Sequence, residues 1–123
     1  MKVLLSIKPE FVEKILSGEK RFEFRKNIFK NKSVKTIVIY ATMPIGKVVG
    51  EFDIDNVISD NPDLIWEKTK NYAGVSKQFY DEYFESKVRA FAIVVGKVTQ
   101  YEEPKPLNYF GNNIVAPQSY RYL

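Results

Sequence analysis

The run Gly18-Glu19-Lys20-Arg21-Phe22-Glu23-Phe24-Arg25 joins the end of a helix to the start of a strand. Apolar residues recur at helical spacing over residues 9–16, and glycine is the residue that most often ends a helix in the left-handed conformation. From Arg21 to Arg25, charged residues alternate with phenylalanines, which is the period of a half-buried strand. The run therefore predicts a helix, a turn at Gly18 and a strand, in that order.

Strands and helices alternate through the rest of the chain. Branched and aromatic runs predict strands, and helix starts are marked by Pro9, Asn61-Pro62 and Ser76. We expect strands at 3–7, 21–25, 36–41, 48–58 and 88–101, helices at 9–17, 61–72 and 77–84, and an irregular tail from residue 104. This order predicts an α+β fold, a small mixed β-barrel with flanking helices. Without repeats or a flexible linker, residues 1–123 are expected to form a single domain.

The amino-acid composition excludes several classes of function. The chain has 45% hydrophobic and 15% aromatic residues, so we expect a folded core. No apolar run approaches the roughly 18 residues that span a bilayer, and the N-terminus lacks a signal-peptide pattern, so we expect a cytoplasmic protein without a membrane partner. The absence of histidine and cysteine excludes Ser-His-Asp and Cys-His catalysis and the usual zinc sites. We expect neither a metal nor another cofactor.

The charge is concentrated in the N-terminal third. Residues 1–35 carry ten Lys/Arg and four Asp/Glu, whereas the remaining residues carry nine and eleven. Clustered lysine and arginine favour an anionic partner such as RNA or a nucleotide-like small molecule. The alternative is that these lysines only keep a helix and a loop soluble.

The charged residues of the opening run form the first candidate site. Strand alternation places Glu23 and Arg25 on one face, and Lys20 can join them only from a turn before the strand becomes regular. Between two cations Glu23 stays ionised, while the pKa of Lys20 falls only if the amine is desolvated. The alternative interpretation is a solvated strand face with alternating charges.

Both ends of the chain supply further candidates. Ser6 and Lys8 share a strand face at the start of a helix, where backbone N–H groups favour anions. In the tail, Gln118 and Ser119 could offer hydrogen bonds to a planar base on which Tyr120 stacks. Alternatively, Lys8 is an exposed lysine beside a turn, and the tail only seals one end of the barrel.

Two other clusters are interpreted as structural. Glu51, Asp53 and Asp55 share one face of a strand, which offers no loop to surround a hard cation, so we interpret them as charges that protect an exposed sheet edge. The aromatic run Phe79–Phe84 has helical spacing and is interpreted mostly as core.

The order of these motifs resembles the ASCH domain family of the PUA-like superfamily. The resemblance rests on Ser6-Ile7-Lys8-Pro9, Gly18-x-Lys20-x-x-Glu23-x-Arg25 as the most specific piece, Tyr40-Ala41-x-x-Pro44, Gly50 and Pro117-Gln118-Ser119-Tyr120. It implies a small β-barrel with a cleft that binds RNA or modified nucleosides. By the match to the motif, the cleft is lined by Lys20, Glu23 and Arg25, with contributions from Ser6, Lys8 and the tail.

The resemblance leaves two functional hypotheses. The first is an RNA- or nucleotide-binding protein with a basic cleft and a regulatory or RNA-metabolism role, in which Tyr40 or Tyr120 stacks on the base. The second is a small hydrolase of the ribonuclease or amidohydrolase type, in which Lys20 and Glu23 act on RNA or a modified nucleoside. The similar amidohydrolases carry a threonine three residues after their lysine, where this chain has Glu23, so their nucleophilic hydroxyl is missing here.

Overall fold

Six strands form one curled sheet in the order β2-β5-β4-β3-β1-β6. The computed structural model describes all of residues 1–123. The strands are β1 (Lys2–Ile7), β2 (Phe22–Arg25), β3 (Thr36–Ala41), β4 (Lys47–Asp60), β5 (Ala90–Lys105) and β6 (Arg121–Tyr122). β1 and β3 are parallel and the other neighbours are antiparallel. The predicted mixed α+β fold is confirmed, with the sheet curling into a half-barrel.

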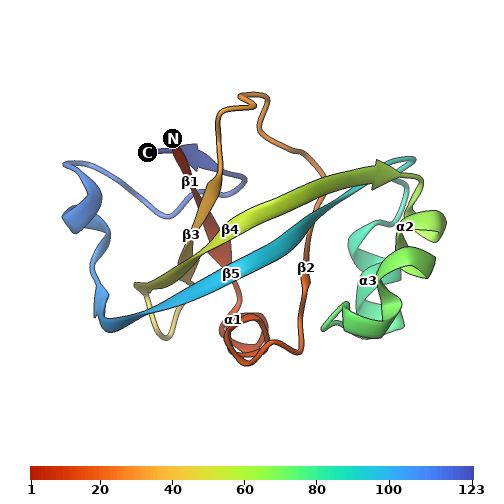
Figure 1. The fold of residues 1–123 in the computed structure, drawn as a ribbon, viewed down its shortest axis with the longest axis horizontal. Helices are drawn as coiled ribbons and strands as arrows, with labels where there is room; N and C mark the ends of the chain where they lie inside the picture. The colour runs from red at the N-terminus through yellow and green to blue at the C-terminus, as the bar shows by residue number, and fades with distance from the viewer.

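The curl comes from β4 and β5, the two long strands that cross the molecule diagonally in Figure 1. Their pairing shifts register at three places between Val48 and Asn56. Such bulges bend the strands and increase their twist. At Gly50 a Cβ atom would lie 2.5 Å from the Thr99 carbonyl oxygen, so only glycine allows the close approach. The bend leaves β2 as one free edge of the sheet and the second half of β1, beyond its short pairing with β6, as the other.

Three α-helices and two short 3-10 helices flank the sheet. They are α1 (Pro9–Ser17), α2 (Pro62–Thr69), η1 (Lys70–Tyr72), α3 (Lys77–Tyr83) and η2 (Leu107–Phe110). The predicted helix starts are confirmed, because Asn61 and Ser76 cap α2 and α3 with their side chains. The helix expected over 61–72 is α2 followed by η1. No helix is long and apolar enough to cross a membrane.

The core consists of three apolar clusters. The largest fills the curl between β1, β3 and α1, and includes Val3, Leu5, Ile15, Ile37 and Phe52. The second lies under α2 and α3, which stand together at one end of the sheet in Figure 1, and includes Phe24, Ile65, Tyr80 and Phe84. The third lies on the opposite face of β1 and β3, where the C-terminal segment covers Leu4, Val38, Tyr40 and Val48.

Two expectations about the long strands need correction. β4 is not a sheet edge, because it pairs with β3 on one side and β5 on the other. Its Glu51 accepts hydrogen bonds from Lys2 Nζ at 3.1 Å and from the Tyr101 hydroxyl at 2.9 Å. The last long strand, β5, continues through Pro104 to Lys105, beyond its expected end at Tyr101. The strand tolerates the proline because Pro104 lies where β5 has little pairing with β4, so few hydrogen bonds of the sheet depend on an N–H there. The C-terminal segment then returns to pair with β1 as β6.

Candidate functional site

A cavity of about 140 Å³ opens between the two free edges of the curled sheet and α3. Seven of its twelve lining residues are hydrophobic, and the other five are polar or charged. The polar lining consists of Ser6, Lys8, Lys20, Glu23 and Arg25. A mostly apolar wall with a few convergent polar groups is the usual composition of a small-molecule site.

Lys20 enters this cavity from the link between α1 and β2. Gly18 ends α1 with a φ of 87°, and the N–H of Lys20 donates to the Lys14 carbonyl at 2.9 Å, which closes the helix end. The Lys20 side chain is 1% exposed, and its Nζ donates to the Ala73 carbonyl at 2.7 Å. The prediction that Lys20 joins Glu23 from a turn is therefore confirmed: Nζ lies 4.0 Å from Glu23 Oε1.

Gly74 makes room for the Lys20 side chain. A Cβ atom at Gly74 would lie 2.4 Å from Lys20 Cβ, and the backbone of Gly74 has a φ of 68°. Both facts require glycine. The link between η1 and α3 thus positions Lys20 in two ways. The Ala73 carbonyl accepts a hydrogen bond from its amine, and Gly74, having no side chain, leaves space for its stem. The sequence identified Gly74 only as the end of a helix.

Burial sets the protonation of Lys20. Desolvation lowers the pKa of Lys20 from 10.5 to about 8, against the opposing attraction of Glu23 and with a smaller lowering contribution from Lys14. The rings of Phe24 and Phe11 lie 4.7 and 5.5 Å from Nζ and stabilise the cation. Burial therefore increases the fraction of Lys20 that is the neutral amine, which can accept a proton.

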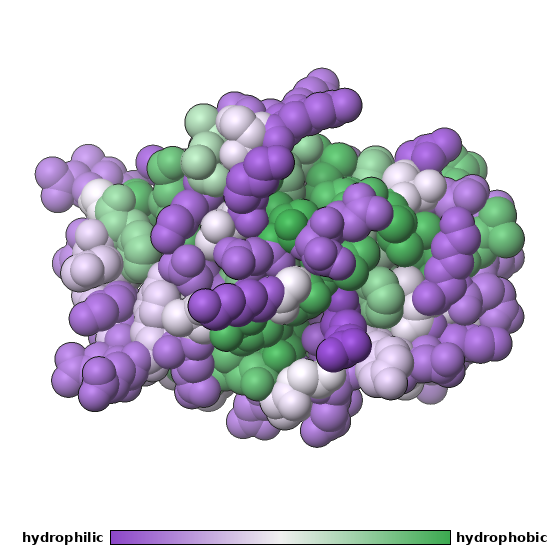
Figure 2. Space-filling model, in the orientation of Figure 1, coloured by the Kyte–Doolittle hydropathy of each residue, from purple (hydrophilic) through white to green (hydrophobic).

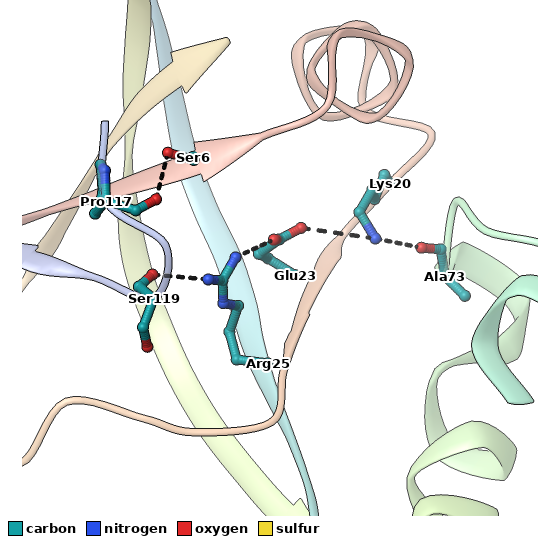
Figure 3. Close-up of polar contacts among 7 residues, drawn as sticks. All are labelled: Ser6, Lys20, Glu23, Arg25, Ala73, Pro117 and Ser119. Carbon is teal, nitrogen blue, oxygen red and sulfur yellow. Dashed lines mark hydrogen bonds and ion pairs between the residues drawn. The ribbon is translucent and has the colours of Figure 1, made fainter. Parts of the chain in front are cut away.

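A chain of polar contacts leads from Lys20 to the C-terminal segment (Figure 3). Arg25 Nη1 donates to Glu23 Oε2 at 3.3 Å, and Arg25 Nη2 donates to the Ser119 carbonyl at 2.7 Å. The Ser6 hydroxyl donates to the Pro117 carbonyl at 2.8 Å. Glu23 is thus held between two cations, and backbone carbonyls of the tail fix Arg25 and Ser6.

Helix α3 provides the aromatic wall of the cavity. The rings of Phe79 and Tyr83 are nearly parallel, with centroids 6.2 Å apart and an interplanar angle of 10°. Lys8 Nζ lies 5.2 Å from the Phe79 centroid and Lys26 Nζ lies 4.6 Å from that of Tyr83. Burial raises the pKa of the Tyr83 hydroxyl, so it remains a hydrogen-bond donor. The interpretation of this run as mostly core is confirmed, because Tyr80 and Phe84 are buried in the second cluster and Tyr83 packs against it. Phe79 is half-buried, and it lines the cavity together with Tyr80 and Tyr83.

Comparison with known proteins identifies the family of this chain. The family model of the ASCH domain matches residues 5–101. The chain belongs to the ASCH domain family. It is 34% identical over 122 residues to the large ribosomal subunit protein uL22 of Ureaplasma parvum, covering 98% of this chain but only 39% of that relative. It therefore spans well under half the length of that relative.

Another relative, which is itself an ASCH domain protein, matches over most of its length. The chain is 30% identical over 125 residues to an ASCH domain-containing ribonuclease of Zymomonas mobilis, covering 98% of this chain and 82% of the relative. The crystal structure of ASCH from Zymomonas mobilis superimposes with a TM-score of 0.92 at 30% identity, covering 99% of this chain and 87% of that one. The half-barrel described above is thus the ASCH fold.

The remaining candidate residues of this ASCH domain lie outside the cavity lining. Tyr40 stands opposite Ser6 in the strand register but is buried in the third core cluster. Tyr120 packs edge-on against Phe29 at 5.9 Å, while Gln118 and the Ser119 side chain are exposed. The tail therefore reaches the site through its backbone, and binding by these four side chains stays a prediction.

Proposed function

We propose that the cavity binds a base of RNA or of a nucleotide-like ligand, in a protein of RNA metabolism. The carrying observation is the carboxylate of Glu23, held between Lys20 and Arg25 in the wall of an apolar, aromatic-lined cavity. A cavity of about 150 Å³ can hold one benzene ring, so a cavity of about 140 Å³ suits a single planar ring with its sugar and phosphate outside.

Different residues at the cavity would contact different parts of the ligand. Glu23 would accept hydrogen bonds from amino or imino N–H groups of the base, and Phe79 would contact its face. Lys8 lies at the cavity mouth beside the N-terminus of α1, where it suits a phosphate. The family and the ribonuclease relative support an RNA-related role at this coarse level.

Calorimetric titration with ribonucleosides, their monophosphates and short oligoribonucleotides tests this proposal. Glu23→Gln should weaken base binding about tenfold or more, because a charged acceptor is lost from a desolvated site. Phe79→Ala should weaken it by about 1–3 kcal/mol through lost stacking. Glu85→Gln removes an exposed carboxylate that makes no ion pair and should change nothing. Wild-type protein that binds no member of the panel would contradict the proposal.

A second candidate, hydrolysis of RNA, is favoured by Lys20 and by the ribonuclease relative. The neutral Lys20 amine would accept the proton of a ribose 2′-hydroxyl as its oxygen attacks phosphorus. The bond from phosphorus to the 5′-oxygen of the next nucleotide would break, that oxygen would leave with a proton from water, and a 2′,3′-cyclic phosphate would remain. Arg25 would face the negative charge that develops on the phosphate oxygens. The cleavage rate should then rise with pH up to about pH 8 and level off above it, since the neutral amine is the active form. RNA that stays intact with bound wild-type protein would exclude hydrolysis and leave the binding function.

A further inference from the structure

The C-terminal half of β5 is a sheet edge without a partner strand. β2 pairs only with residues 91–94 of β5, and one further hydrogen bond, from the Val95 N–H to the Arg21 carbonyl at 2.9 Å, extends that contact. From Gly96 onward, β5 pairs with β4 on one side and with no strand on the other. In Figure 1 this half of β5 runs to the left, past β2 and α1. Its free side presents backbone N–H and C=O groups that an added strand can pair with.

The side chains along this edge are mostly polar. Val98 packs against the main core and Tyr101 against the third cluster, on the opposite face, so side chains alternate regularly here. Lys97 and Glu103 are exposed, and neither takes part in an ion pair of the chain. The surface at the lower left of Figure 2, where this edge lies, is mostly hydrophilic. A strand added here would be held by backbone hydrogen bonds and by charge more than by apolar burial.

The order of charges along the edge is complementary to itself. Lys97, Thr99, Tyr101 and Glu103 share one face of the strand because of the alternation. A second copy can pair antiparallel to this strand about a two-fold axis through Gln100. Lys97 of each chain then lies opposite Glu103 of the other, and Thr99 lies opposite Tyr101. Opposite charges that face each other across an antiparallel pair stabilise it.

Other registers lose this match. The smallest shift that keeps the faces of the two strands matched is two residues. In one direction it places Lys97 opposite Lys105, which repel each other, and in the other it places Lys97 opposite Tyr101. In the register centred on residue 100, Pro104 lies opposite Gly96, and the pairing ends there because proline has no N–H. The sequence of the edge therefore favours one register.

We infer that two copies of the chain associate through this edge, with their β5 strands antiparallel, so that the two sheets become continuous. The inference does not depend on the proposed function, because no residue of β5 lines the cavity. Pairing over about seven residues is a small contact for a protein interface, so the dimer is weak and reversible.

Sedimentation velocity at about 1 to 500 µM protein measures this association. The wild type should change from monomer to dimer as the concentration rises. Lys97→Glu should weaken the dimer about tenfold or more, because two pairs of opposite charges become pairs of like charges. Lys97→Glu/Glu103→Lys should restore association to within about threefold of the wild type, since opposite charges face each other again. The matched control Lys87→Glu makes the same charge change at an exposed, unpaired lysine outside this edge and should leave association unchanged.

Hydrogen exchange at the two ends of this concentration range locates the contact. Amides within residues 97–103 should exchange more slowly at the high concentration, while those of β2 should keep their rates. A wild-type chain that stays monomeric throughout overturns the inference. A dimer that Lys97→Glu does not weaken, that the reversed charge pair does not restore, or that protects amides elsewhere also overturns it.

Discussion

Burial of Lys20 should make the stability of the protein rise with pH in the alkaline range. The folded protein releases the Lys20 proton at a pKa of about 8, whereas an unfolded lysine holds it to 10.5. Between these values the unfolded state binds more protons, so the free energy of unfolding increases with pH. In Lys20→Met this titration is absent, while the apolar stem is replaced by one of similar length.

The size of the effect follows from the two pKa values. A full shift from 10.5 to about 8 corresponds to about 3 kcal/mol, and integration between about pH 8 and pH 10 gives a gain of about 2 kcal/mol for the wild type over Lys20→Met. Burial raises the pKa of Tyr80, whose ring lies in the second cluster, so its hydroxyl stays neutral in this range.

Urea unfolding of both proteins at a series of pH values measures this difference. The wild type should gain on the variant as pH rises, with most of the gain above about pH 8. Groups that the two proteins share contribute equally to both curves and cancel in the difference. Two parallel stability curves would refute the account, because they would show that Lys20 titrates at its ordinary pKa and is not desolvated.

Three further substitutions test the support of the site. Gly74→Ala should lower the free energy of unfolding more than Gly18→Ala does, and it should also weaken ligand binding. Both glycines have positive φ, so either substitution costs about 1 kcal/mol through backbone strain. Only at Gly74 would the new Cβ collide with the Lys20 side chain, whereas nothing lies within 4 Å of a Cβ at Gly18. Thermal melts and titrations of the pair check this, and equal effects would contradict it. Arg25→Lys should cost about 1–2 kcal/mol, since one ammonium cannot replace the two-pronged contact with Glu23 and the Ser119 carbonyl; an unchanged melting curve would contradict that geometry.

Local rules described most of the charged run. Gly18 at a helix end and the alternation over β2 placed Glu23 and Arg25 on one face and allowed Lys20 to join them from a turn, but they left a solvated strand face as the alternative. The same reasoning correctly tied the pKa of Lys20 to its desolvation. These predictions depend on contacts between residues that are close in the sequence, where turn chemistry and strand period decide the geometry.

The parts that the sequence could not predict depend on contacts between distant segments. The Ala73 carbonyl meets Lys20 across 53 positions, and the Ser119 carbonyl meets Arg25 across 94. Backbone carbonyls leave no signal in the side-chain pattern. Helical spacing marks Phe79 as apolar but not whether it faces core or cavity. The central place of β4 likewise depends on β5 crossing the sheet, which no local pattern records.

A crystal structure of the protein with a bound short oligoribonucleotide tests the central claim most directly. The account predicts one unstacked base in the cavity, with an N–H group of the base on the Glu23 carboxylate and its ring beside Phe79. RNA bound elsewhere on the surface, with the cavity empty and the Lys20–Glu23–Arg25 contacts undisturbed, would contradict it.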